Sequence, residues 1–286
     1  MNTSTSTSTP SLTPHDLSIL SKIADPESTP SPLLLSPSLP KDPHITTPTL
    51  YQSLTTLETT IIHPLRATEL QLAGFHPTLT GSPSATQQYQ TAISALTSLI
   101  NEHPTYASAR NNRAQALRRV YGDGVLVQQA EGQEDGGIEV EAERLCKATD
   151  TQELSSVSKT LLLDLKTAIH LLTPPPYSPI SPTAAKTLSL AYTQRGAIYL
   201  RTAKLLSIPG SKLIFSSQGQ EGGEGVEEAK WETIDFEEAA ARDFMWGGRY
   251  GNEVSKALAV ATNPTAKLCG SIVREAMVRE FGGQGV

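Results

Sequence analysis

The sequence predicts an all-α fold, an α-α superhelix of about three helix hairpins that ends in C-terminal capping helices. Leu and Ala recur at helical spacing along most of the chain, and only 5% of the residues are aromatic, so aliphatic side chains must fill the core. In Pro104–Val120 a proline ends one helix, a polar turn follows, and the next helix carries Ala107, Ala109, Ala114 and Ala116. Small residues let neighbouring helices pack closely, which is typical of helical repeats.

The spacing around this stretch matches a repeat made of one helix hairpin, the tetratricopeptide (TPR) unit. Ala92, Leu96, Leu99 and Pro104 follow one another at intervals of 4, 3 and 5 residues, as in the second helix of that unit. Each leading helix should also carry one small residue at a fixed place. The residues that take this place in three successive units are Gly74, Ala114 and Gly196.

The first unit comprises the helices expected over 49–76 and 84–103. Leu and Ile recur at helical intervals in the first of them, and Pro64 should introduce a kink or a break. The second unit opens with a helix over 106–121, which Gly122 and Gly124 end.

The closing helix of the second unit is displaced along the chain. Its best match is the segment 158–172, where Leu161, Leu165 and Ala168 keep the spacing of 4 and 3 residues. The third unit is expected over 183–206 and 226–244, and Gly247-Gly248 should break the chain after it. Two further helices, 249–261 and 264–281, would then cover the end of the stack.

Segments poor in helical pattern set the domain boundaries. Residues 1–48 are rich in Ser, Thr and Pro and are expected to be largely disordered, apart from a short amphipathic helix over 14–23. Glycine-rich stretches predict flexible insertions inside the helical domain. The expected organisation is a TPR-like helical domain over 49–281, flexible insertions near 122–152 and 207–225, and a flexible tail over 282–286.

The charge and hydropathy of the chain argue against nucleic acid and membrane partners. The formal net charge is -6, and the Lys and Arg residues are scattered instead of forming a basic stripe. No stretch approaches the roughly 18 consecutive apolar residues of a membrane helix. The opening residues lack the features of a secretory signal or a transit peptide, so we expect a cytoplasmic protein, with the nucleus as the alternative.

The sequence lacks the motifs that mark enzymes. It has no phosphate-binding glycine loop, no HExxH motif and no nucleophile elbow. Cys146 and Cys269 lie far apart, and the 6 histidines occur singly, so no metal site is expected. These observations predict a non-catalytic protein without a cofactor.

The leading helices of a TPR stack line a concave groove that binds extended peptides or partner helices. The residues expected to face this groove are Asn111, Asn112, Gln115 and Arg119 from the second unit and Gln194 and Arg201 from the third. Their amides and guanidinium groups suit a peptide backbone or a carboxylate. The alternative is that the amides, together with Arg113 and Arg195, bond within the scaffold.

Several motifs in the same order resemble the tetratricopeptide repeat protein 36 family. They are SARNNRAQALRRVYGD, LLLDLKTAIHL, AYTQRGAIY, DFEEAAA and NPTAKLCGSIVREAM, and the early TPHDLSILSKIADPES resembles the opening segment of that family. The resemblance covers most of Leu50–Met277, interrupted by insertions. It implies a three-repeat, non-catalytic adaptor, a chaperone association and a link to tyrosine breakdown.

One feature of chaperone-binding TPR domains is missing. Domains that grip the acidic tails of cytosolic chaperones carry a clamp of Lys, Asn, Asn, Lys and Arg, and only Asn112 agrees with it here. The corresponding positions hold Thr68, Leu72, Asn112, Leu190 and Gln194. Without the cations the charge-assisted hydrogen bonds are lost, so we expect little or no binding of this kind.

Two functional hypotheses follow. The favoured one is a protein-protein interaction adaptor that binds a partner peptide or helix in the groove. The alternative is an unrecognised enzyme or small-molecule-binding regulator that uses a pocket beside the groove, next to the second-unit insertion.

Overall fold

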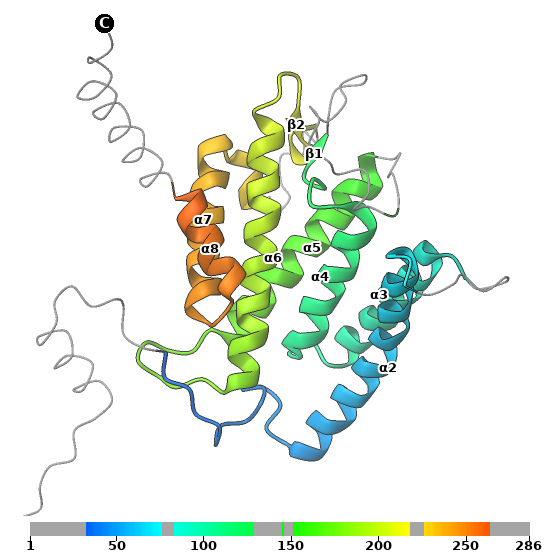
Figure 1. Cartoon of the computed structure of the whole chain (residues 1–286), viewed down its shortest axis with the longest axis vertical. Coiled ribbons are helices and arrows are strands. Elements are labelled where there is room, and N and C mark those ends of the chain that lie inside the picture. Colours follow the sequence, from blue (N-terminus) through cyan, green and yellow to red (C-terminus); the bar gives the residue numbers. More distant parts are fainter. Residues whose placement is uncertain (1–32, 76–82, 129–144, 146–150, 218–225, 264–286) are drawn as a thin grey trace, which may run out of the picture.

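The computed structural model describes residues 33–75, 83–128, 145, 151–217 and 226–263, and these residues fold mainly into α-helices (Figure 1). The helices are α2 (Pro48–Leu72), α3 (Ala85–Glu102), α4 (Ala107–Tyr121), α5 (Thr151–Leu172), α6 (Pro182–Leu206), α7 (Thr233–Arg249) and α8 (Glu253–Thr262). Two 3-10 helices, η1 (Ile214–Ser217) and η2 (Glu227–Lys230), and two short strands complete the described part. The all-α class is confirmed. The helices predicted over 14–23 and 264–281, and the tail over 282–286, lie outside the described residues.

Helices that follow one another in sequence are also neighbours in space. Each helix from α2 to α7 packs against the next one, and α4 additionally contacts α6 (Figure 1). Short connections favour this arrangement for α3 with α4 and for α7 with α8, because a helix that follows a tight turn folds back onto the one before it. The pairs α4–α5 and α6–α7 are neighbours although long insertions separate them in sequence.

Local sequence signals set several helix ends. Ser84 caps α3 by accepting a hydrogen bond from the Gln87 backbone N–H, and the Gln87 side chain accepts one from the Ser84 N–H, forming a capping box. Ser181 accepts from the Ala184 N–H at the start of α6, where Pro182 suits the first helical turn. These signals explain why the predicted and observed starts of both helices agree within one residue.

Pro64 does not break α2. The helix runs through it from Pro48 to Leu72, although a proline removes the hydrogen bond to the carbonyl four residues earlier. Both Pro64 and Thr60, whose carbonyl loses its partner, are exposed, so water can satisfy that carbonyl. The hydroxyl of Thr68 donates to the Pro64 carbonyl in the next turn.

The break predicted at Gly247-Gly248 is wrong, because α7 continues through both glycines to Arg249. A Cβ atom on Gly248 would lie 2.8 Å from the Cα of Lys256, so the missing side chains allow α8 to approach α7. The segment predicted as one helix over 226–244 is instead divided into η2 and α7. The Glu232 carboxylate accepts from the backbone at the start of α7 and Asp235 accepts from the Glu232 N–H, and this capping box begins the new helix.

Parts of the two insertions lie in the core. Strand β1 (Val127–Gln128) pairs antiparallel with β2 (Lys212–Leu213), and Val127 lies opposite Leu213. The Ile214 N–H donates to the Leu126 carbonyl, which extends this contact, and Leu126 is fully buried. Residues 126–128 and 212–214, inside the insertions predicted near 122–152 and 207–225, therefore connect the helix pairs α4–α5 and α6–α7. The middle parts of both predicted insertions lie outside the described residues.

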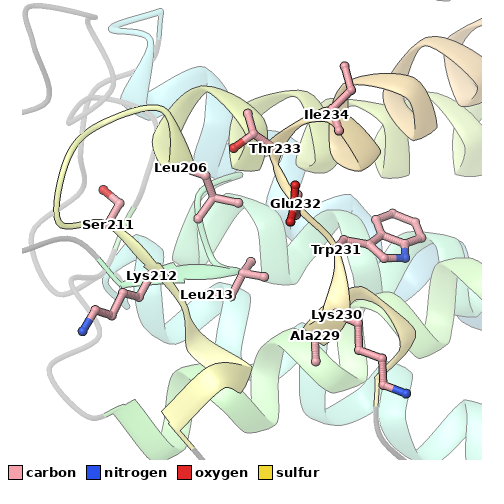
Figure 2. A pocket seen from close by; sticks show the side chains of 10 residues that line it. All are labelled: Leu206, Ser211, Lys212, Leu213, Ala229, Lys230, Trp231, Glu232, Thr233 and Ile234. Atoms are coloured by element: carbon pink, nitrogen blue, oxygen red, sulfur yellow. The ribbon is translucent and has the colours of Figure 1, made fainter.

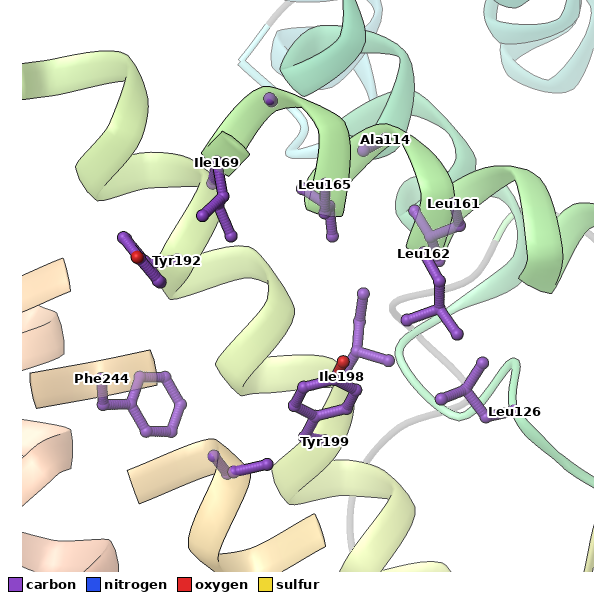
Figure 3. Close-up of a cluster of buried hydrophobic side chains, with 14 of the residues drawn as sticks. Ala114, Leu126, Leu161, Leu162, Leu165, Ile169, Tyr192, Ile198, Tyr199 and Phe244 are labelled. Atoms are coloured by element: carbon purple, nitrogen blue, oxygen red, sulfur yellow. The ribbon is translucent and has the colours of Figure 1, made fainter. Parts of the chain in front are cut away.

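The main hydrophobic core lies among α4, α5, α6 and α7 (Figure 3). Leu161 and Leu165 of α5, Ile198 of α6 and Phe244 of α7 are completely buried in it, and full burial of such side chains contributes about 1.5–3 kcal/mol each. Two smaller clusters join α2 and α3 to α4. Helix α4 therefore contributes to all three clusters and connects the two ends of the described part.

Candidate functional site

Helix α4 lies between α2 and α6 and forms polar contacts with both. These three helices are the predicted leading helices, and four of the predicted groove residues form contacts between them: Asn111, Asn112, Arg119 and Gln194. We call this region the α2-α4-α6 face, defined by Glu58, Glu69, Asn111, Asn112, Gln115, Arg119 and Gln194. The contacts of each residue show which of them is available to a partner.

Asn111 and Gln194 connect α4 with α6. The Gln194 Nε2 donates to the side-chain oxygen of Asn111 at 2.8 Å, and also to the Asn111 backbone carbonyl at 3.3 Å. Both residues are buried, with exposed fractions of 3% and 7%. The structure therefore places both amides in scaffold contacts, in line with the alternative interpretation.

Asn112 faces the opposite neighbour, α2. Its Nδ2 donates to the carboxylate of Glu58 at 2.7 Å, and the same carboxylate accepts from the hydroxyls of Tyr106 at 2.6 Å and Ser108 at 3.1 Å. Glu58 is buried, and burial, followed by the nearby Glu58 charge, raises the pKa of Tyr106 well above its usual value. The one residue that agrees with the chaperone clamp is thus occupied by an internal carboxylate.

Arg119 forms a second link between α4 and α2. Its Nε lies 2.9 Å from a carboxylate oxygen of Glu69, which also accepts from the Tyr89 hydroxyl at 2.8 Å. Partial desolvation disfavours the charged carboxylate, but the hydrogen bonds from Arg119 and Tyr89 outweigh it and hold the pKa of Glu69 below its usual value. The side chains are 24% and 42% exposed, so the pair remains accessible to a partner.

Gln115 is exposed on α4, one helical turn before Arg119. Arg201 lies on α6 and is half-buried. The structure therefore leaves Gln115, the Glu69–Arg119 pair and part of Arg201 within reach of solvent. The other three predicted amides, Asn111, Asn112 and Gln194, are engaged between helices.

Arg113 and Arg195 are scaffold residues, as the alternative interpretation expected. Arg113 binds both carboxylate oxygens of Asp164 at 2.7 and 2.8 Å, and Arg195 binds those of Asp243 at the same distances. Burial opposes the charged form of Arg195, yet its hydrogen bonds to Asp243 raise its pKa further above the ordinary value. Asp164 also receives a hydrogen bond from Arg110 at 3.2 Å.

Sequence reasoning missed Glu58 and Glu69, the acidic residues that hold Asn112 and Arg119. A signal for Glu58 was present, because it lies on the apolar stripe of α2, four residues after Leu54 and seven before Leu65, where an unpaired charge would be costly. The identity of its partners depends on the packing of α2 against α4, which the local pattern does not show.

One surface pocket lies between β2 and the start of α7 (Figure 2). It has a volume of about 620 Å³ and is lined by Leu206, Ser211, Lys212, Leu213, Ala229, Lys230, Trp231, Glu232, Thr233 and Ile234. Figure 2 shows the ammonium groups of Lys212 and Lys230 pointing away from each other, so they do not converge on one ligand atom. The alternative hypothesis, an enzyme or small-molecule-binding regulator, requires a pocket beside the groove and next to the second-unit insertion. Most of that insertion lies outside the described residues.

A larger pocket lies between residues 37–48 and one side of α2. Its volume is about 930 Å³. It is lined by Pro37, Ser38, Leu39, Pro40, Lys41, Ile45, Thr46, Pro48, Tyr51, Gln52, Thr55, Thr56, Thr59 and Thr60. The sequence did not predict it, since it assigned the residues before α2 to a disordered segment.

Neither a metal centre nor a membrane helix is found in the part of the chain that the structure describes. Within those ranges no group of three His, Cys, Asp or Glu side chains is arranged to bind a metal ion. The described helices are too short or too polar to cross a membrane.

Comparison with known proteins gives one informative relationship. No protein-family model matches the chain, and no solved structure matches it. The chain is 36% identical over 288 residues to the "L-tyrosine degradation gene cluster protein hmgX" of Aspergillus fumigatus, and the similarity covers 96% of each of the two proteins. Because this identity extends over nearly the whole of both sequences, the chain belongs to the family of the Aspergillus fumigatus L-tyrosine degradation gene cluster protein hmgX.

Proposed function

We propose that this protein is a non-catalytic adaptor of the TPR type that binds a partner protein during L-tyrosine degradation. In this proposal α2 with α3, α4 with α5, and α6 with α7 are three hairpins of an α-α superhelix, related to the tetratricopeptide repeat protein 36 family. The partner is a peptide or helix of an enzyme that acts in the degradation of L-tyrosine.

The observation that carries the proposal is the repeated link between helices within a hairpin. Arg113 of α4 binds Asp164 of α5, and Arg195 of α6 binds Asp243 of α7, each through two hydrogen bonds. The arginines directly precede Ala114 and Gly196, the small residues that the sequence assigned to equivalent positions. Recurrence of one contact at equivalent positions supports a repeat array, whose leading helices present a continuous surface to a partner.

The connection with tyrosine rests on the relative. The Aspergillus fumigatus protein is named for an L-tyrosine degradation gene cluster, and the resemblance to the tetratricopeptide repeat protein 36 family implies the same pathway. The name of the relative states no catalytic activity, and the missing enzyme motifs of the sequence favour an adaptor role. The occupied Asn112 amide favours a partner other than an acidic chaperone tail.

The α2-α4-α6 face is the proposed binding surface, with Gln115 and the Glu69–Arg119 pair as its accessible polar groups. All six predicted groove residues belong to the proposed binding region. Because Asn111 and Gln194 are buried, we expect the direct contacts with the partner to come from Gln115, Arg119 and Arg201. Such a polar, partly exposed surface suits hydrogen bonds to a peptide backbone and to a carboxylate side chain.

The test is recovery of a partner from cells that grow on L-tyrosine and express the tagged full chain. Affinity purification followed by mass spectrometry should recover a tyrosine-degrading enzyme at near-stoichiometric amount. Gln115→Ala combined with Arg119→Ala should reduce that amount at least about tenfold, which corresponds to 1.4 kcal/mol. The matched control is Glu253→Ala with Lys256→Ala, an exposed pair on α8.

A second variant separates binding from folding. Exchanging Glu69→Arg with Arg119→Glu retains an ion pair between α2 and α4 but reverses the charges on the face. The variant should remain folded, with a loss of about 1 kcal/mol because the Tyr89 hydroxyl loses its acceptor, and it should lose the partner. Recovery of no tyrosine-degrading enzyme, or equal recovery with the groove and control variants, would contradict the proposed function.

A further inference from the structure

The pocket between residues 37–48 and α2 has the construction of a small-ligand site. Its volume of about 930 Å³ lies within the range of roughly 300–1,000 Å³ that is usual for such sites. Leu39, Ile45 and several prolines supply apolar walls, and Tyr51 supplies an aromatic ring. A pocket of this type holds a ligand by apolar contact and orients it by a few polar groups.

The wall formed by residues 37–48 is fixed to the rest of the fold at several points. Just before this wall, the Leu34 carbonyl accepts from the Ile180 N–H at 2.9 Å. Within it, the Lys41 carbonyl accepts from the Ser181 hydroxyl at 3.2 Å, and the His44 ring nitrogen lies 3.0 Å from the Leu171 carbonyl. Ile45 is buried in the cluster that joins α2, α3 and α4. These contacts hold the segment that forms this wall in place beside α2.

The one charged residue that lines the pocket, Lys41, favours an anionic ligand. Its ammonium lies 5.6 Å from the centroid of the Tyr51 ring. Within the described residues no carboxylate lies within ion-pair distance of Lys41. A ligand carboxylate would therefore meet an ammonium that has no ion-pair partner among the described residues and lies beside an aromatic ring, although the charges of Glu58 and Asp42 also act on Tyr51.

The opposite wall is a row of threonines on α2 that accept hydrogen bonds. The hydroxyls of Thr55, Thr56, Thr59 and Thr60 donate to the backbone carbonyls four residues earlier, at distances of 2.7–2.9 Å. A hydroxyl has one hydrogen and two lone pairs, so each of these oxygens remains only as an acceptor. This wall favours a ligand that offers an O–H donor some distance from its carboxylate.

We propose that this pocket binds a small 4-hydroxyphenyl carboxylate, with the carboxylate at Lys41, the ring against Tyr51 and the phenol donating to a threonine of α2. The choice of an aromatic acid related to tyrosine rests on the proposed function, whereas the anionic and aromatic character rests on the pocket alone. Such a ligand would make the adaptor responsive to the acids formed when tyrosine loses its amino group.

The test uses the purified full chain and isothermal titration calorimetry with 4-hydroxyphenylacetate as the probe. Saturable binding with a Kd below about 1 mM is expected. Phenylacetate, which lacks the phenol, should bind about threefold to tenfold more weakly, which corresponds to the loss of one hydrogen bond. Tyramine, which carries an ammonium in place of the carboxylate, should not bind.

Two variants locate the site, and each has a matched control. Lys41→Ala should weaken binding at least about tenfold, whereas Lys204→Ala, an exposed lysine in the last turn of α6, should not. Thr59→Trp fills the pocket and should abolish binding. Ala67→Trp places the same side chain on an exposed part of α2 that lines neither this pocket nor the one adjoining it, and should leave binding unchanged.

Absence of saturable binding, equal binding of tyramine, or binding that survives Thr59→Trp would overturn the ligand site. The titration contains no partner protein. A negative result would therefore not contradict partner binding on the α2-α4-α6 face. Conversely, failure to recover a partner would contradict the adaptor function. Binding of the acid, together with its loss in Lys41→Ala, would still support the ligand site.

Discussion

Arg113 on α4 and Asp164 on α5 form a two-point ion pair, and Arg195 on α6 and Asp243 on α7 form another with the same geometry. Each pair joins the two helices of one hairpin. The carboxylates are almost fully buried, with side-chain exposures of 0% and 3%. Because buried charges must be compensated, each pair fixes the alignment of its two helices as well as their contact.

Removing one member of the second pair should destabilise the protein strongly. Arg195→Met leaves the Asp243 carboxylate buried without its cation and should cost about 3–5 kcal/mol in the free energy of unfolding, measured by urea denaturation at pH 7. Combining it with Asp243→Leu removes both charges and should recover most of that loss. A double variant as unstable as the single one would contradict this account.

Gly248→Ala should weaken the packing of α8 on α7. The added Cβ would lie 2.8 Å from the backbone of Lys256, so α8 must shift, at a cost of about 1–3 kcal/mol. Amide hydrogen exchange should become faster in α8 while the amides of α3 and α4 remain protected. Glu253→Ala, at an exposed position of α8, serves as the control. Unchanged amide exchange of α8 in Gly248→Ala would contradict the close contact between α7 and α8.

Glu58→Ala should weaken the contact between α2 and α4 and lower the free energy of unfolding. Three donors, from Tyr106, Ser108 and Asn112, lose their shared acceptor, and the expected loss is about 2–4 kcal/mol. Tyr106→Phe removes one of these bonds and should cost about 1.5–3 kcal/mol. Chemical denaturation measures both. A Glu58→Ala protein as stable as the wild type would show that the carboxylate is not held by these contacts.

The Glu69–Arg119 pair should stabilise the protein in a pH-dependent way. The pKa of Glu69 is lowered in the folded state from its usual 4.5, so its contribution is fully present above pH 4.5 and is lost as the pH falls through the lower folded value. Glu69→Gln should therefore be less stable than the wild type at pH 7, by less than about 1 kcal/mol because the pair is partly exposed. Thermal unfolding at pH 7 and pH 3 should show this difference disappearing at the lower pH. A constant difference would contradict the titration of Glu69.

Much of the helical fold was predictable because its signals are local. The capping box at Ser84 and Gln87, the Ser181-Pro182 start of α6, and the apolar spacing of Leu161, Leu165 and Ala168 each act within a few residues. The prediction of a break at Gly247 and Gly248 was wrong because a contact between two helices, and not a local signal, decides the structure there. Glycine is a poor helix former, but here its lack of a side chain allows α8 to approach α7, and that benefit is visible only once both helices are in place.

The sequence by itself determined most of the described helices and the polar residues that α2, α4 and α6 carry, because helix formation follows from spacing and capping along the chain. Only the tertiary structure decided which of those polar residues are engaged. Asn111 and Gln194 bond to each other, Asn112 bonds to Glu58, and Gln115 stays exposed. The same packing brought residues 37–48 against α2 to form a pocket and paired β1 with β2. These contacts join residues far apart in sequence, so their partners depend on how the helices pack and not on any local pattern.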